Sequence, residues 1–173
     1  MNKKILIVYA SKCGSTAEVA QALCQDLLHS GAAVEVLPVR EVRSLKGVDA
    51  VVIGTAIRMG KPLGEANRFV NQFKADLKQI PTAVFSVGVA MNEDTPAART
   101  EAAGYIAPLV ANLSKNAATA TFGGKLDYKT LPALFRFMFS KDTSGKLHEG
   151  DWRNWDAIDA WADTLPAALG LTA

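Results

Sequence analysis

Five short runs of aliphatic and β-branched residues recur along this chain, and each is separated from the next by a longer stretch with helical spacing. Strands buried on both faces are nearly continuous apolar runs, and strands that alternate with helices form a parallel sheet. The predicted strands are Lys4 to Ala10, Val34 to Pro38, Ala50 to Gly54, Thr82 to Gly88 and Ala118 to Phe122. The predicted fold class is α/β, with a doubly wound five-stranded parallel sheet, and 173 residues fit a single domain, 1–173.

Helical spacing of apolar residues predicts the connections between these strands. The first helix ends at Gly31, a natural C-terminal cap, and the second runs from Gly64 to Leu77. The third covers Thr95 to Leu113, where Gly104 and Pro108 are expected to break or kink it.

A last helix is predicted from a cap at Asp151. Its apolar residues, expected to pack in the core, are Trp152, Trp155, Ile158, Trp161 and Leu165. The preceding stretch, about 123–150, does not fit the alternation and is interpreted as a helical insertion after the fifth strand.

Charge and composition exclude several classes of function. Nineteen Lys and Arg residues against seventeen Asp and Glu give a net charge of +2, which argues weakly against nucleic-acid binding. No apolar run approaches the roughly 20 residues that span a bilayer, and the N-terminus lacks the features of a signal peptide. Two cysteines and two histidines predict neither a disulfide framework nor a metal site, so a cytoplasmic protein is expected.

The loop after the first strand is the best candidate for an anion site. Ligands of open parallel sheets bind at the carboxyl ends of the strands, where helix N-termini also lie. This phosphate loop consists of Ser11, Lys12, Cys13, Gly14, Ser15 and Thr16. Its small and hydroxyl-bearing residues allow a tight turn whose N–H groups and hydroxyls can donate to a phosphate.

Other phosphate-binding classes do not fit this loop. It has no Gly-x-Gly-x-x-Gly pattern and no Walker lysine, which argues against a dinucleotide site and against ATP or GTP hydrolysis. The third strand ends without the aspartate of a receiver domain, and no arginine follows Cys13 at the spacing of a thiol phosphatase. An ordinary capped turn remains the alternative for the loop taken alone.

Two further loops of small residues follow the third and fourth predicted strands. The first wall is Thr55, Ala56, Ile57, Arg58, Met59 and Gly60. The second wall contains Ser86, Val87, Gly88 and Val89 and extends to Asn92. A phosphate loop with two walls at one sheet edge suits a mononucleotide that carries a flat ring.

With these loops in place, the chain resembles the flavodoxin-like family, whose first loop has the pattern Ser/Thr-x-Thr-Gly-x-Thr and binds FMN. Ser11, Gly14 and Thr16 match the pattern, whereas Cys13 replaces its central hydroxyl residue. The resemblance implies the strand order 2-1-3-4-5 and an FMN site formed by the phosphate loop and the two walls.

Several later segments are similar to the menaquinone-dependent protoporphyrinogen dehydrogenase subfamily. They are Val52 to Gly60 with Phe69 and Val70, Gly124 to Leu126, Phe135 to Met138, and Asp151 with Trp152. The resemblance implies an FMN-dependent oxidoreductase that oxidises protoporphyrinogen IX with a quinone as acceptor. The alternative is a flavodoxin-type electron-transfer protein without its own small-molecule substrate. A third interpretation is a non-catalytic FMN-binding module.

The residues of the walls bear on the flavin chemistry. Neither wall contains an aromatic residue. A cation at Arg58 would stabilise a reduced anionic flavin and raise its reduction potential. The alternative interpretation of Arg58 is a solvated surface charge. No residue is predicted to act as a catalytic acid or base, since the cofactor carries the chemistry.

Three features leave their roles open. The apolar segment 131–139 is flanked by lysines and is predicted to be a lid over the flavin, a contact with a quinone or the inner face of the membrane, or a dimer interface. The polar turn 142–145 is expected to close over the ring. Cys13, at a helix N-terminus beside Lys12, is either a redox-sensitive thiolate or the occupant of a small-residue slot.

Overall fold

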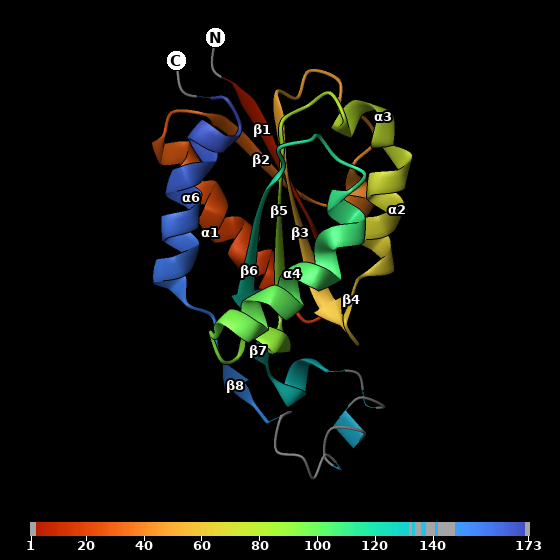
Figure 1. The fold of residues 1–173 in the computed structure, drawn as a ribbon, viewed down its shortest axis with the longest axis vertical. Coiled ribbons are helices and arrows are strands. Elements are labelled where there is room, and N and C mark those ends of the chain that lie inside the picture. Colours follow the sequence, from red (N-terminus) through yellow and green to blue (C-terminus); the bar gives the residue numbers. More distant parts are fainter. Residues whose placement is uncertain (1–2, 132, 134–135, 138–140, 142–147, 172–173) are drawn as a thin grey trace.

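The computed structural model describes residues 3–131, 133, 136–137, 141 and 148–171. Its main sheet has five parallel strands in the order β2-β1-β3-β5-β6 (Figure 1), with a short strand, β4, paired antiparallel to β3. The strands are β1 Lys4–Ala10, β2 Ala33–Pro38, β3 Ala50–Arg58, β4 Lys61–Pro62, β5 Thr82–Gly88 and β6 Ala118–Gly123. The predicted fold class and the order of the five parallel strands are confirmed.

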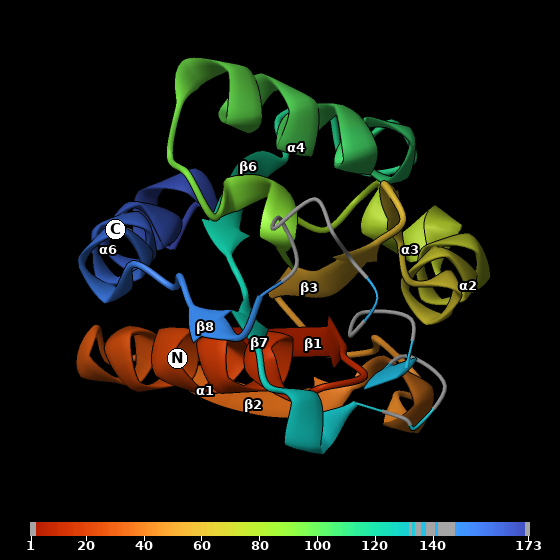
Figure 2. The same ribbon diagram turned by 90° about the horizontal axis from the view of Figure 1, so that it is seen from below.

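Helices cover both faces of the sheet, as Figure 2 shows from its carboxyl end. On one face lie α1 (Ser15–His29) and α6 (Trp155–Ala168). On the other lie α2 (Gly64–Gln72), α3 (Lys74–Leu77) and α4 (Pro96–Val110). Successive side chains of a strand point to opposite faces, so β1 sends Ile5 and Ile7 to the α1 and α6 side and Leu6 and Val8 to the other.

Two helices in the middle of the chain differ from the predictions. The expected helix from Gly64 to Leu77 divides at Phe73, whose φ of −105° and ψ of 19° leave the helical region. The expected break in the third helix is wrong, because α4 runs continuously through Gly104 and Pro108. Pro108 removes one i→i−4 backbone hydrogen bond in the last turn of α4, and the helix ends two residues later, at Val110.

The last helix begins later than predicted. Asn154 is the residue that caps α6, accepting a hydrogen bond from the Ala157 N–H at 3.1 Å, so the predicted cap at Asp151 is wrong. The prediction that Trp155 packs in the core is wrong, because Trp155 is 39% exposed. Trp161 packs against Phe85 as expected, with ring centroids 6.0 Å apart.

The ends of the predicted insertion are joined by a second small sheet. Strand β7 (Lys125–Leu126) pairs antiparallel with β8 (Gly150–Asp151), and both lie at the carboxyl end of the main sheet (Figure 1). A short 3-10 turn, Tyr128–Thr130, follows β7. Most of the predicted segment 131–139 and the whole turn 142–145 lie outside the described residues, so their predicted roles stay untested.

Candidate functional site

The phosphate loop connects β1 to α1 at the carboxyl edge of the sheet. Gly14 adopts the left-handed conformation at φ 91°, which glycine tolerates without strain. Its N–H donates to the Ser11 hydroxyl at 3.1 Å, and its carbonyl accepts from the Glu18 N–H at 3.0 Å as α1 begins. The loop therefore turns sharply into the helix, and the first N–H groups of α1 lack partners within the helix.

Thr16, in the first turn of α1, has a buried hydroxyl without a partner among the described residues. Its side chain is 0% exposed, and the hydroxyl atom concerned is Oγ1. A buried hydroxyl without a partner costs about 1–3 kcal/mol, so such groups are uncommon without a reason. A phosphate seated on the N-terminus of α1 would provide the acceptor that this hydroxyl lacks.

Lys12 makes an ion pair away from the turn. Its ammonium Nζ lies 2.7 Å from Oε1 of Glu65, which stands in the first turn of α2. Lys12 lowers the pKa of the Glu65 carboxyl through this hydrogen bond, although burial of Glu65 opposes the shift. Lys12 thus ties the phosphate loop to α2, and the groups of the loop that remain for an anion are backbone N–H groups and hydroxyls.

Cys13 does not have the low pKa expected of a reactive thiol. Burial raises the pKa of the Cys13 thiol, and the positive charge of Arg58 offsets this only in part. The expectation that the helix end and Lys12 would favour the thiolate is therefore wrong. Occupation of a small-residue slot is the interpretation of Cys13 that remains.

The first wall is a strand end and a hairpin rather than a loop. Strand β3 continues through Arg58, and a two-residue turn at Met59 (φ 51°) and Gly60 (φ 71°) leads into β4. Two consecutive residues with positive φ are typical of the tight hairpin turn that matches strand twist. The turn leaves the Met59 side chain 91% exposed at the sheet edge.

Three residues of this wall turn toward the protein interior. Thr55 is fully buried, and its hydroxyl accepts from the Leu63 N–H at 3.2 Å and lies 3.1 Å from the Ala56 carbonyl oxygen. Ala56 and Ile57 pack against the core beneath α2 and α4. Arg58 is exposed, and its positive charge acts on Cys13 in the phosphate loop, where it lowers the pKa of the thiol against the larger effect of burial.

The second wall is likewise only partly open. Ser86 and Val87 are each 2% exposed within β5, so these two residues offer almost no accessible surface to a ligand. Gly88 lies at the strand end, where a Cβ would come within 3.0 Å of the Ile57 Cβ, so the two walls approach each other closely here. Val89 follows in a 3-10 turn and is 44% exposed.

Asn92, at the end of the second wall, carries another polar atom without a partner in the described part of the chain. Its side-chain oxygen Oδ1 is buried and accepts no hydrogen bond. This oxygen follows β5 and its 3-10 turn, and the Thr16 hydroxyl lies in the first turn of α1, directly after β1 and its loop. The structure thus brings hydrogen-bonding capacity to the sheet edge where the sequence places the site.

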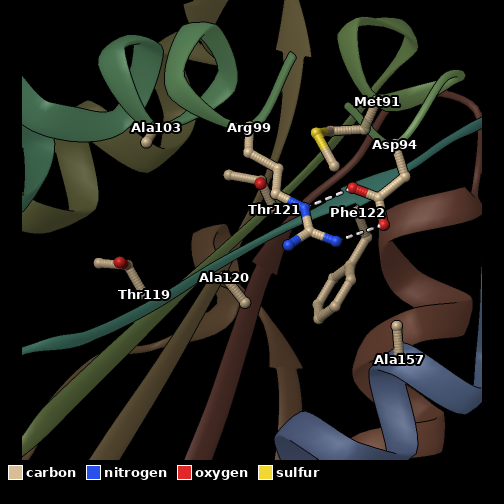
Figure 3. Close-up of a pocket in the computed structure, with 9 residues that line it drawn as sticks. All are labelled: Met91, Asp94, Arg99, Ala103, Thr119, Ala120, Thr121, Phe122 and Ala157. Atoms are coloured by element: carbon tan, nitrogen blue, oxygen red, sulfur yellow. Dashed lines mark hydrogen bonds and ion pairs between the residues drawn. The ribbon is translucent and has the colours of Figure 1, made fainter. Parts of the chain in front are cut away.

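A groove of about 320 Å³ lies elsewhere, along the edge strand β6 between α4 and α6 (Figure 3). Arg99 crosses it and donates to both carboxylate oxygens of Asp94, at 2.5 and 2.8 Å. These polar groups satisfy each other, and the groove runs beside the sheet rather than over the strand ends. It therefore does not compete with the phosphate loop as the functional site.

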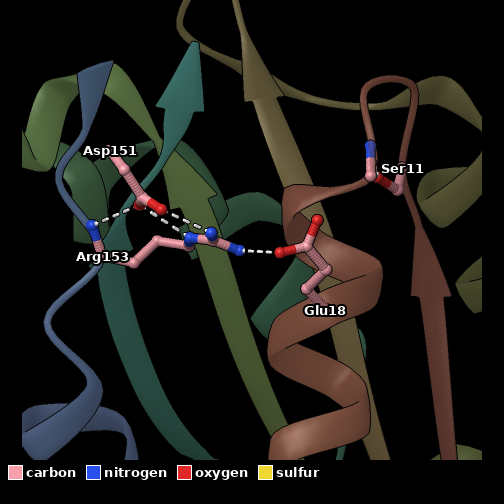
Figure 4. Close-up of polar contacts among 5 residues, drawn as sticks. Ser11, Glu18, Asp151 and Arg153 are labelled. Carbon is pink, nitrogen blue, oxygen red and sulfur yellow. Dashed lines mark hydrogen bonds and ion pairs between the residues drawn. The ribbon is translucent and has the colours of Figure 1, made fainter. Parts of the chain in front are cut away.

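Sequence reasoning missed a charge network next to the loop, in which an enclosed arginine joins two exposed carboxylates (Figure 4). Arg153, whose side chain is 5% exposed, pairs with Asp151 at the end of β8 and with Glu18 in the first turn of α1. Arg153 lowers the pKa of Asp151 by donating to its carboxylate, and burial opposes that shift. Glu18 and Arg153 are 135 residues apart, so no local pattern could have paired them.

These features define a doubly wound α/β protein with a tight loop between its first strand and α1, and with a buried, unpartnered hydroxyl at the start of that helix among the described residues. A model of the flavodoxin domain family matches residues 6–151, and the chain belongs to this family.

Comparisons of sequence and of structure also found individual proteins that are similar to this chain. Protoporphyrinogen IX dehydrogenase (quinone) of Escherichia coli K12 is 31% identical over 88 residues, which cover 50% of this chain and 49% of that protein. The chain thus aligns with about half the length of this relative. Flavodoxin 1 of Bacillus cereus has a TM-score of 0.60 at 13% identity and covers 99% of both chains. Rubredoxin oxygen:oxidoreductase of Desulfovibrio gigas has a TM-score of 0.62 at 14% identity, covering 98% of this chain and 37% of that one.

Both structural matches show the shared fold alone, since their identities are low. Among the described residues no helix is long and apolar enough to cross a membrane. The same residues contain no group of three or more His, Cys, Asp or Glu side chains arranged to hold a metal ion.

Proposed function

We propose that this chain is an FMN-dependent oxidoreductase whose cofactor phosphate binds at the N-terminus of α1. The family typically binds FMN and transfers electrons, which indicates a redox protein. The single observation that carries the proposal is the Thr16 hydroxyl, fully buried and without a partner in the described structure. An FMN phosphate accepts hydrogen bonds, which this hydroxyl and the nearby backbone N–H groups can donate.

The phosphate loop would hold the phosphate without a direct cationic side chain. Gly14 supports the turn, and Ser11, Ser15 and Thr16 contribute hydroxyls, while Lys12 is engaged by Glu65. The exposed ends of the two walls, Arg58 to Gly60 and Gly88 to Val89, would flank the flavin ring. FMN supplies hydride or electron transfer, and the protein supplies position and electrostatics.

Arg58 is the residue of this chain that is expected to tune the flavin. Its positive charge acts on Cys13 in the phosphate loop, and its place at the end of β3 would put that charge near the proposed ring. A cation there favours an anionic reduced flavin and raises the reduction potential. Replacement of Arg58 by Gln should lower the potential of the hydroquinone couple, measured by equilibration with a reference dye, and an unchanged potential would contradict this role.

The substrate that we propose is protoporphyrinogen IX, with a quinone as electron acceptor. The similarity to the Escherichia coli enzyme of that name supports this choice. A near-neutral chain with a net charge of +2 also suits the acidic carboxylates of porphyrins better than a strongly acidic carrier does. We further propose a cytoplasmic location.

The second candidate is an electron-transfer protein without its own small-molecule substrate. The overall similarity to a Bacillus flavodoxin favours it, because the two folds cover nearly the full length of each other. It predicts that the flavin exchanges electrons with a protein partner and that protoporphyrinogen is not consumed.

Two measurements test these alternatives in order. The purified chain should be yellow, or should take up FMN after its removal, and a colourless chain that does not take up FMN would refute the cofactor. Steady-state oxidation of protoporphyrinogen IX with a naphthoquinone acceptor then separates the candidates. Turnover that depends on bound FMN supports the enzyme, and FMN loading without turnover supports the electron carrier.

A further inference from the structure

Arg153 is an enclosed charged side chain near the phosphate loop. Only 5% of its side chain is exposed, and its guanidinium forms two hydrogen bonds to Asp151, Nε to Oδ1 at 2.8 Å and Nη2 to Oδ2 at 2.5 Å. The Trp155 ring covers it, with the guanidinium carbon 4.8 Å from the ring centroid. The remaining nitrogen, Nη1, donates to Oε2 of Glu18. A planar guanidinium is suited to hold two carboxylates at fixed positions.

Glu18 joins this network to the anion site. It lies in the first turn of α1, and its Oε1 is 3.9 Å from where a Cβ on Gly14 would stand. Figure 4 shows the Glu18 carboxylate projecting from α1 between Arg153 and the loop that carries Ser11. Glu18 therefore holds a negative charge at the same helix end as the unpartnered Thr16 hydroxyl.

The Glu18 carboxylate and a bound phosphate would both be negative charges at the N-terminus of α1, and Arg153 reduces the repulsion between them. A carboxylate in the first turn is favourable for the helix alone, but it repels a second anion at the same end. The Arg153 cation offsets that negative charge, and its own second carboxylate, Asp151, stands on the far side of the guanidinium (Figure 4). Lys125 in β7 adds a further positive charge that acts on Asp151.

We propose that Arg153 is a positioning residue for the phosphate of FMN: it neutralises Glu18 and so keeps the N-terminus of α1 receptive to that phosphate. The inference rests on the proposed function. Because Asp151 ends β8 and β8 pairs with β7, the affinity for the phosphate depends on docking of the two ends of the 123–150 segment against α1. Arg153 affects the binding of the phosphate and not the binding of the flavin ring.

The test compares FMN with riboflavin, which lacks the phosphate, by titrating the apoprotein and following flavin fluorescence. In Arg153→Met the dissociation constant for FMN should rise about tenfold, since one unpaired charge near a dianion in a partly hydrated site is worth a factor of that order. The constant for riboflavin should not change. Adding Glu18→Gln to Arg153→Met should restore FMN binding to within about twofold of wild type.

Two other variants complete the design. Arg99→Met removes an arginine that is paired with an aspartate in the same way, at the β6 groove, and should leave both ligands unaffected. Glu18→Gln alone keeps the Arg153 contact with Asp151, so it tests the charge argument even if Arg153→Met does not fold. It should tighten FMN binding about threefold without changing riboflavin binding.

The outcomes separate the two proposals. Wild-type apoprotein that does not bind FMN contradicts the proposed function. If wild type binds FMN, the role of Arg153 is overturned by any of three results: equal weakening of FMN and riboflavin in Arg153→Met, no restoration by Glu18→Gln in the double variant, or weaker FMN binding in Glu18→Gln alone.

Discussion

Thr16→Val replaces the unpartnered buried hydroxyl with a methyl group of nearly the same shape. The side chain is 0% exposed, and its hydroxyl makes no hydrogen bond in the described structure, so the apoprotein bears the cost of desolvating it. Because that cost is about 1–3 kcal/mol, Thr16→Val should raise the free energy of unfolding of the apoprotein by about 1 kcal/mol. For a chain of this size, this corresponds to an increase in Tm of about 2–4 °C.

The same substitution should weaken FMN binding. A hydrogen bond to a charged acceptor contributes about 1.5–3 kcal/mol, so the dissociation constant should rise by about one to two powers of ten. Urea denaturation of the apoprotein and fluorescence titration with FMN measure the two effects on one preparation. Opposite effects on stability and on affinity are the signature of a group that is kept for binding.

Thr82→Val is the matched control, because Thr82 is also buried but its hydroxyl donates to the Ile80 carbonyl at 2.8 Å. It should lower the free energy of unfolding by about 1 kcal/mol and leave the affinity for FMN unchanged. The reasoning fails if Thr16→Val destabilises the apoprotein as much as Thr82→Val does, or if Thr16→Val binds FMN as tightly as wild type.

Other predictions concern the core and the α1–α6 interface. Gly54→Ala should destabilise the protein by about 3 kcal/mol or more in urea denaturation, because the new Cβ would lie 2.2 Å from the buried Phe85 ring. Adding Phe85→Leu to Gly54→Ala should recover part of this loss, and additive effects of the two substitutions would contradict the explanation. Burial raises the pKa of Asp26, and the carboxylates of Asp159 and Asp163 raise it further. The protonated form of Asp26 therefore stabilises the fold fully at a pH below the unfolded-state pKa, and this stabilisation is lost as the pH rises through the folded-state pKa. Asp26→Asn should therefore be more stable than wild type at pH 7.5, with a smaller difference at pH 4.5, and a difference that grows on acidification would refute the assignment.

Local patterns predicted the strands well where burial is complete. The bounds of β1 and β5 coincide with the predicted runs, since both strands are covered on two faces and their apolar runs have no ambiguity. Strand β3 was predicted to end at Gly54 but continues to Arg58. Its last residues pair with β4 through the hairpin, and the mixed residues from Thr55 to Arg58 do not show that pairing in the sequence.

The candidate site was predicted in outline, and the roles of its side chains were not. The phosphate loop lies at the sheet edge as expected, because a short turn between a buried strand and a helix leaves few other arrangements. However, Lys12 is paired with Glu65, and Thr55 bonds to the backbone of its own hairpin. Such choices depend on which partner the folded chain brings within reach of each polar group.

The amino-acid sequence alone determined the alternation of strands and helices, the edge of the sheet that holds the loops, and the family, because these depend on periodicity and on residues close together in the chain. Only the tertiary structure decided which charges meet. Arg153 and Glu18 come together across 135 residues, and the Thr16 hydroxyl is left without an acceptor among the described residues. Hydrogen bonds and ion pairs act over a few ångströms, so their partners are set by the packing of α1, α6 and β8 rather than by spacing along the chain.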